Sequence, residues 1–180
     1  MRLLALIFAI SIMAGCTTYT PQRYSISANN NVALKEAKVG NIAVGEFNGP
    51  KNFSSACRAA GPISPPDNLS FQEYIRQALI SELKVADVYN ESNPKITISA
   101  EVDMLSFSST RSLLGGSWDV GMRVNSSNGK SAYVKEHYEF NSGFVADIAC
   151  KQTAEAFLPT VQNLIERLVK STDFKKLATP

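Results

Sequence analysis

The sequence is poor in the residues that build most active centres. Its 180 residues include one histidine, one tryptophan and three cysteines. It contains neither a glycine-rich phosphate loop nor a serine nucleophile elbow. The only metal-ligand pair on one predicted strand face is His137 with Glu139, which is fewer ligands than a zinc site needs. These absences predict a protein without a cofactor or a bound metal, and they favour a non-enzymatic role.

The sequence also lacks a strong charge of either sign. Eighteen basic residues against sixteen acidic residues give a formal net charge of +2, which is too small to indicate a nucleic-acid partner. No stretch after the N-terminal region approaches the roughly 20 apolar residues that a membrane-spanning helix needs. Hydrophobic residues at 44% and charged residues at 19% are ordinary for a globular chain. The main part of the sequence therefore predicts a folded domain.

The N-terminus has the pattern of an export signal. Met1 and Arg2 form a short positive region, the stretch from Leu3 to Met13 is apolar except for Ser11, and two small residues, Ala14 and Gly15, follow. This apolar stretch is shorter than the roughly 20 residues needed to span a bilayer. Residues 1–15 are therefore predicted to be a signal peptide that is removed.

The run Met13-Ala14-Gly15-Cys16 resembles the lipobox of bacterial lipoproteins, although that family usually has leucine where this chain has Met13. The resemblance implies that the chain is cut before Cys16 and that Cys16 carries acyl chains such as palmitate. Thr17, where inner-membrane retention favours aspartate, implies an outer-membrane location with the domain in the periplasm. Two or three acyl chains anchor a protein stably, whereas one binds marginally. The alternative is an ordinary signal peptide cut near Ala14, with Cys16 as a spare thiol.

Residues 16–31 are polar and show no hydrophobic period. They include Pro21 and the asparagine run 29–31, a composition typical of a flexible linker. We expect a lipidated tether over 16–31, reaching at most about 50 Å when extended, and a single globular domain over 32–180.

The other two cysteines, Cys57 and Cys150, remain as an even set once Cys16 is assigned to lipid. Thiols tend to pair in the oxidising compartment that export implies. We therefore expect a disulfide that pins the proline-rich loop 48–68 to the C-terminal helical region. The alternatives are two free buried cysteines, or one catalytic thiol assisted by His137.

Hydrophobic periodicity predicts alternating elements in the domain. Helix 70–83 begins at a capping box formed by Ser70 and Glu73, and it turns Glu82 outward. Pro159 is expected to kink the last helix near Glu155 or to divide it in two. The expected elements are a strand over 38–47, the helix over 70–83, strands over 95–107, 117–125 and 131–140, and the helix over 144–171. This order, β-α-β-β-β-α, predicts an α+β two-layer sandwich with a mainly antiparallel sheet of about four strands and two helices on one face.

The last two strands allow their register to be predicted. A three-residue loop with Gly129 in the left-handed region pairs apolar residues across the hairpin: Val124 with Ala132, Met122 with Val134 and Trp118 with Tyr138. In the 95–107 strand the apolar alternation runs through Met104 and then changes phase, which indicates a bulge. The hairpin register turns Glu136 inward opposite Val120. A carboxylate there either reaches water at the sheet edge or, if buried, marks a functional site.

The loop 110–118 carries Leu113 and Leu114 beside two glycines. This apolar tip is a candidate contact for a partner or a lipid, and the alternative is that it folds back on the sheet. The layout after the lipobox is similar to that of small outer-membrane lipoproteins of the LptE and YajG types. Their resemblance implies a non-catalytic docking or assembly partner in the Gram-negative cell envelope. The alternatives are a lipid or glycolipid carrier and, third, a cysteine-dependent hydrolase.

Overall fold

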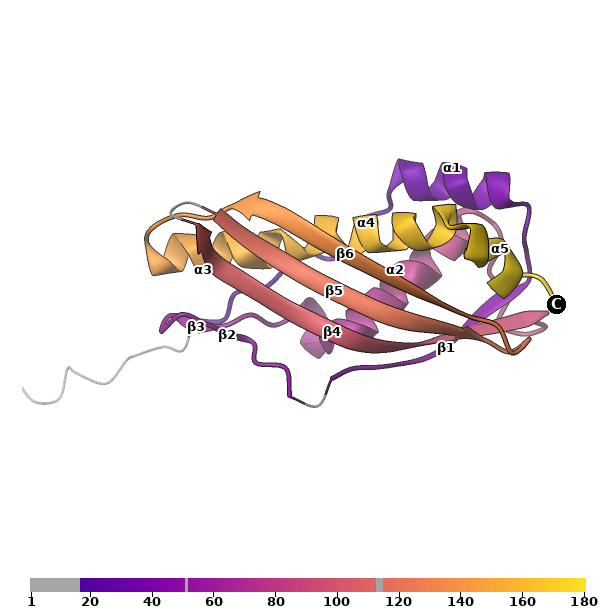
Figure 1. The fold of residues 1–180 in the computed structure, drawn as a ribbon, viewed down its shortest axis with the longest axis horizontal. Helices are drawn as coiled ribbons and strands as arrows, with labels where there is room; N and C mark the ends of the chain where they lie inside the picture. Colours follow the sequence, from indigo (N-terminus) through magenta and orange to yellow (C-terminus); the bar gives the residue numbers. More distant parts are fainter. Residues whose placement is uncertain (1–16, 51, 113–114) are drawn as a thin grey trace, which may run out of the picture.

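The computed structural model describes residues 17–50, 52–112 and 115–180. Its centre is a four-stranded mixed sheet in the order β1-β4-β5-β6. The strands are β1 (Ile42–Asn48), β4 (Ile96–Ser112), β5 (Gly115–Ser126) and β6 (Ser131–Asn141). β1 runs parallel to β4, and the other neighbours are antiparallel. Figure 1 shows these strands running along the length of the molecule.

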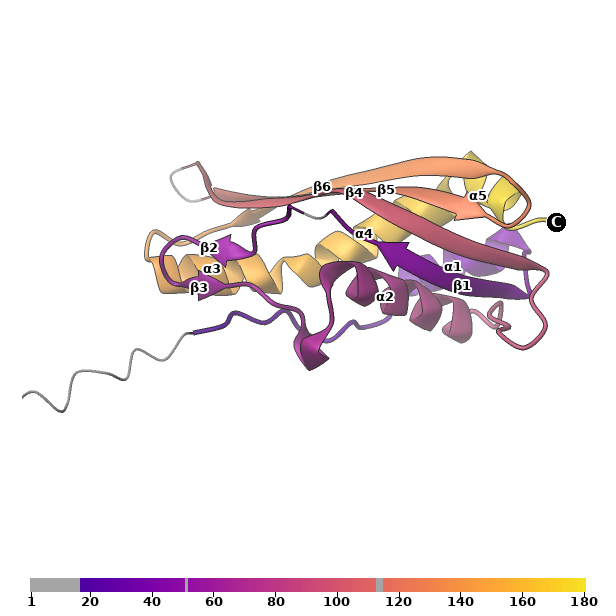
Figure 2. The same ribbon diagram turned by 90° about the horizontal axis from the view of Figure 1, so that it is seen from below.

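Three helices cover one face of the sheet. They are α2 (Phe71–Val85), α3 (Ala146–Glu155) and α4 (Phe157–Lys170). α1 (Ala28–Ala37) packs against α2 and α4, and α5 (Thr172–Leu177) follows α4. Short elements precede α2, namely β2 (Ala56–Cys57), β3 (Gly61–Pro62) and the 3₁₀ turn η1 (Pro66–Asn68). Figure 2 shows the sheet on one side and the helical layer on the other, which confirms the α+β two-layer class.

None of the helices within the described residues combines the length and the apolar character needed to cross a membrane.

An aromatic cluster fills the space between the two layers. Trp118 of β5 is fully buried, and its ring centroid lies 4.8 Å from that of Phe157 and 5.7 Å from that of Phe71. The indole Nε1 donates a hydrogen bond of 2.7 Å to the carbonyl of Thr153, so the polar atom of this large side chain is satisfied. The interior is therefore packed with side chains.

The β5–β6 hairpin has the predicted register. Val124 pairs with Ala132, Met122 with Val134 and Trp118 with Tyr138. Gly129 has φ 82°, a left-handed conformation that glycine adopts without steric cost. The apolar pattern and the turn chemistry point to the same register, and the structure confirms it.

The bulge in β4 lies one step earlier than expected. Its register against β5 shifts between Val102 and Met104, so Leu105 faces the core while Met104 is exposed. The sequence pattern had included Met104 in the buried set, and this was wrong. An inserted residue reverses the side-chain alternation at that point, and only the pairing with β5 shows where it lies.

The C-terminal helical region is divided at Ala156 into two helices, α3 and α4. This division is one of the two arrangements that Pro159 predicted, the other being a kink in a single helix. Pro159 lies in the first turn of α4, where its missing N–H costs no helical hydrogen bond. In one continuous helix over 144–171, Ile148 would lie on the same apolar side as Phe157 and Val161, but it is exposed. The reason is that α3 is a separate helix, and it buries a different set: Ala149, Cys150, Thr153 and Ala154.

The residues that follow Cys16 are folded onto the domain. The N–H of Tyr19 donates to the carbonyl of Pro62, and the N–H of Ser64 donates to the carbonyl of Tyr19, both at 2.9 Å. Tyr19 is buried, Ser27 caps α1, and α1 begins at Ala28. The expectation of a flexible tether is therefore wrong for residues 17–31, because buried aromatic side chains and backbone pairing hold this polar segment. Cys16 itself lies outside the described residues.

Candidate functional site

Cys57 and Cys150 form a disulfide that joins β2 to α3. Their Cα atoms are 5.8 Å apart, and both residues are fully buried. Neither sulfur is a thiol in this structure, and His137 lies on an exposed part of β6 among other partners. The structure thus does not bring together the cysteine and histidine of the hydrolase hypothesis.

Arg58, next to the disulfide, ties three chain segments together. Its guanidinium donates hydrogen bonds of 2.7 Å to the carbonyls of Phe144 and Ser109, and one of 3.1 Å to the Ser109 hydroxyl. We call the region formed by residues 17–19, 56–62 and 143–150 the disulfide end. The disulfide and Arg58 hold it together from within. No local sequence pattern predicts this role of Arg58.

The N-terminal segment docks on the disulfide end. The Tyr19 hydroxyl donates a hydrogen bond of 2.8 Å to Asp147 at the start of α3, and this bond raises the pKa of Tyr19. The backbone of Thr17 lies so close to Gly61 that a Cβ atom on Gly61 would come within 1.9 Å of the Thr17 oxygen. The residue that follows Cys16 is therefore in contact with the domain, at the end opposite the C-terminus (Figure 1).

A buried carboxylate, Glu82 of α2, holds the next part of the N-terminal segment. Its Oε1 accepts hydrogen bonds from the Tyr24 hydroxyl at 2.5 Å, the Ser27 N–H at 2.8 Å and the Asn30 side-chain amide at 3.2 Å. Burial, followed by the bond to Glu82, raises the pKa of Tyr24. The prediction that Glu82 points outward is therefore wrong. The available signal was its position four residues after Ala78, on the flank of the apolar stripe.

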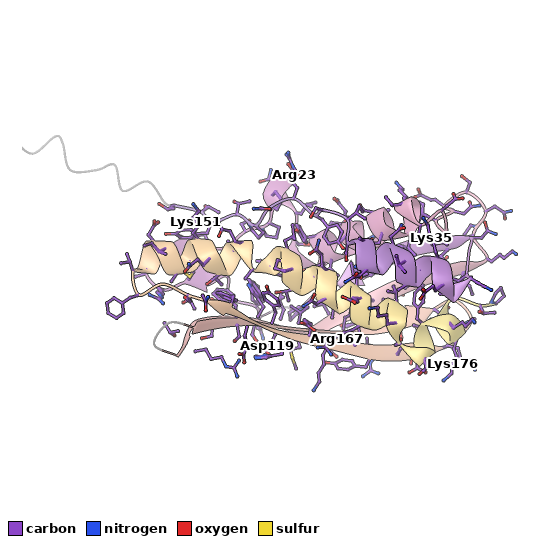
Figure 3. All side chains as sticks on the ribbon, turned by 90° about the horizontal axis from the view of Figure 1, so that it is seen from above. Arg23, Lys35, Asp119, Lys151, Arg167 and Lys176 are labelled. Carbon is purple, nitrogen blue, oxygen red and sulfur yellow. A yellow bond between two sulfur atoms is a disulfide. The ribbon has the colours of Figure 1, made fainter. Side chains whose placement is uncertain are left out.

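Glu136 faces inward, as the register predicted, but it does not reach water. It is buried, and it accepts a hydrogen bond of 3.1 Å from the Asn163 amide and pairs with Arg167, which is more than half exposed. Both partners belong to α4, and Figure 3 shows where Arg167 lies. β6 is an edge strand, as that interpretation required, but the expectation that the carboxylate reaches water is wrong, because α4 supplies a cation that compensates the buried charge.

His137 belongs to a polar cluster on the sheet face turned away from the helices, where Figure 3 labels Asp119. Its Nδ1 lies 2.6 Å from Asp119, and its Nε2 lies 3.3 Å from Glu139. Arg111 pairs with Glu139 as well. The hydrogen bonds to Asp119 and Glu139 raise the pKa of His137. Among the described residues no group of three or more ligand side chains could hold a metal ion.

Leu113 and Leu114, the candidate partner contact, lie outside the described residues. The carrier hypothesis required the helices and the sheet to part around an acyl chain. In the structure the aromatic side chains of Phe71, Trp118 and Phe157 occupy that space, so a bound chain would have to displace the core.

No family model and no curated protein matches the sequence. Protein XCC0632 from Xanthomonas campestris, described with the family model DUF330, is similar in structure. Its TM-score is 0.55 at 10% identity, and the match covers 89% of this chain and 97% of that one. A "putative lipoprotein" from Caulobacter crescentus CB15 has a TM-score of 0.50 at 8% identity, covering 83% and 94%. The fold is shared. At these identities the likeness shows nothing beyond the fold.

Proposed function

We propose that this protein is a non-catalytic lipoprotein of the outer membrane, anchored through Cys16, whose domain faces the periplasm and docks on another envelope protein. The observation that carries the proposal is the junction between the lipobox and the domain. The lipobox ends at Cys16, and the next residue, Thr17, lies against Gly61 of the folded domain. The acylated residue is thereby joined to a defined end of the molecule.

Two further features support this assignment. The buried Cys57–Cys150 disulfide suits an oxidising compartment outside the cytoplasm. The fold is shared with the Caulobacter crescentus protein, whose description names a lipoprotein. The non-catalytic part of the proposal is supported by the same disulfide, which occupies both sulfurs, and by the ion pairs that engage His137.

The uncovered face of the sheet is the proposed docking surface. It presents polar and aromatic side chains from β4, β5 and β6, linked across strands by contacts such as the 3.1 Å hydrogen bond from Tyr133 to Asp103. Met104 and Tyr133 are both exposed large side chains on this face, and exposed tyrosine and methionine are typical of interfaces. The packed interior favours docking over lipid carriage.

Anchoring is tested by replacing the acylated residue. Cys16→Ser is expected to abolish metabolic labelling with palmitate and to prevent cleavage at the lipobox, because serine has no thiol to acylate. Thr17→Asp is the matched variant, since it keeps the acylated cysteine and is expected to move the labelled protein to the inner-membrane fraction of a density gradient. Continued palmitate labelling of Cys16→Ser would contradict the proposal.

Docking is tested by photo-crosslinking in native membranes. A photoreactive residue at Lys135, on the uncovered sheet face, or at Leu113 is expected to form a discrete adduct that mass spectrometry identifies as one envelope protein. Lys35, exposed on α1 in the helical layer, is the matched control position and is expected to form none. Absence of an adduct from Lys135, or the same adduct from Lys35, would refute docking through this face.

A further inference from the structure

Three large apolar side chains are exposed together where β6 passes into α3. Phe144 is 80% exposed, Val145 56% and Ile148 49%. We call these three residues the apolar corner. Phe144 is the most exposed of the large apolar side chains among the described residues, and a group of exposed apolar side chains marks a contact surface.

The backbone of the apolar corner is firmly held. The Gly143 N–H donates a hydrogen bond of 2.6 Å to the side chain of Gln152, and the Ser142 hydroxyl donates one of 2.7 Å to the carbonyl of Ser109. Arg58 binds the carbonyl of Phe144 at 2.7 Å, and the disulfide at Cys150 holds the following turn. The side chains are thus presented to the exterior by a fixed loop.

The apolar corner lies beside the N-terminal segment that follows Cys16, the proposed anchor residue. Asp147, which accepts the hydrogen bond of Tyr19, is between Val145 and Ile148 in the sequence. Cys16 precedes Tyr19 by three residues, so their Cα atoms are at most about 11 Å apart. Acyl chains on Cys16 therefore start close to the apolar corner, because the polypeptide between Cys16 and Tyr19 is too short to act as a spacer.

We propose that the apolar corner contacts the phospholipid bilayer, with the Phe144 ring inserted among the acyl chains. This inference rests on the proposed acylation of Cys16. Acyl chains in the bilayer hold Cys16 at the membrane surface, and aromatic and aliphatic side chains within reach of that surface enter the boundary between headgroups and acyl chains. The disulfide end then sits on the membrane, and the opposite end with the C-terminus points away from it (Figure 1).

The test uses the full mature, acylated protein in vesicles of phosphatidylethanolamine and phosphatidylglycerol, with and without bromine on the acyl chains. The variant Phe144→Trp places an indole at the corner, and Lys35→Trp on α1 is the matched exposed control. Trp118 is fully buried and gives a constant background in both. Brominated lipid is expected to lower the added emission of Phe144→Trp roughly twofold, since inserted side chains lie about 5–10 Å into the boundary, and to leave Lys35→Trp unchanged.

Mass spectrometry of each sample separates the two proposals. If Cys16 carries acyl chains and Phe144→Trp is quenched no more than Lys35→Trp, the membrane contact is refuted while the anchor stands. An emission that is blue-shifted in vesicles but unquenched means that protein covers the corner, which also overturns the inference. If Cys16 carries no acyl chain, the proposed function fails, and the membrane contact that rests on it fails as well.

Discussion

Replacing both Cys57 and Cys150 with alanine is expected to lower the free energy of unfolding by about 4 kcal/mol. The two residues are 93 positions apart, and a cross-link that closes a loop of this length removes much conformational entropy from the unfolded chain, about 4 to 5 kcal/mol at 25 °C. The measurement is denaturant unfolding of the mature protein followed by Trp118 fluorescence, since that indole is buried in the core.

Wild-type protein unfolded in the presence of reductant supplies the control for this prediction. It should match the double variant, because both lack the same cross-link in the unfolded state. Native protein without reductant should show no reactive thiol at either position, since both are fully buried and bonded. A loss of stability below about 1 kcal/mol would mean that the cross-link contributes far less than loop closure requires.

Glu82→Ala is expected to destabilise the fold by about 3 kcal/mol. The substitution removes the carboxylate oxygen that accepts hydrogen bonds from three donors, and each donor left unsatisfied costs about 1 kcal/mol or more. The three donors are Tyr24, Ser27 and Asn30. Two of them precede α1 and one lies within it, so the effect should concentrate in the N-terminal segment. Hydrogen exchange of residues 24–34 should rise more than that of β5, and denaturant unfolding gives the total.

Glu82→Gln is the conservative control. It keeps one carbonyl oxygen at the site and should cost less than half as much as the alanine variant. Tyr24→Phe removes a single donor and should cost about 1 kcal/mol. In the Glu82→Ala background the effect of Tyr24→Phe should almost vanish, since the two groups share one hydrogen bond. Equal and additive losses would show that Glu82 does not act through this contact.

Local chemistry predicted the elements well where one interaction decides them. Ser70 caps α2 by accepting a hydrogen bond from the Glu73 N–H at 3.2 Å, as a Ser-x-x-Glu pattern predicts. The Glu73 carboxylate departs from the pattern by pairing with Arg76. α2 runs two residues beyond the predicted end, to Val85, and Tyr89 then forms a single bridge with Ile42.

The candidate sites were less predictable, because their partners are far apart in the chain. Arg58 binds residues 51 and 86 positions away, and Tyr19 binds Asp147 across 128 positions. Neither contact can be predicted from the hydrophobic periodicity or from the turn residues of the sequence. The flexible-tether prediction failed for the same reason, since residues 17–27 are ordered by the backbone of β3 and by side chains of α2 and α3.

The sequence by itself determined the pairing of Cys57 with Cys150, the hairpin register and the class of fold. The hairpin register and the class of fold depend on residues near one another in the chain. The disulfide follows because two cysteines allow only one pairing. Only the tertiary structure decided that Glu82 is buried, that Glu136 is compensated by Arg167, and that Tyr19 contacts Asp147 beside the apolar corner. These depend on which helix faces which strand, and that is settled by packing of the whole domain.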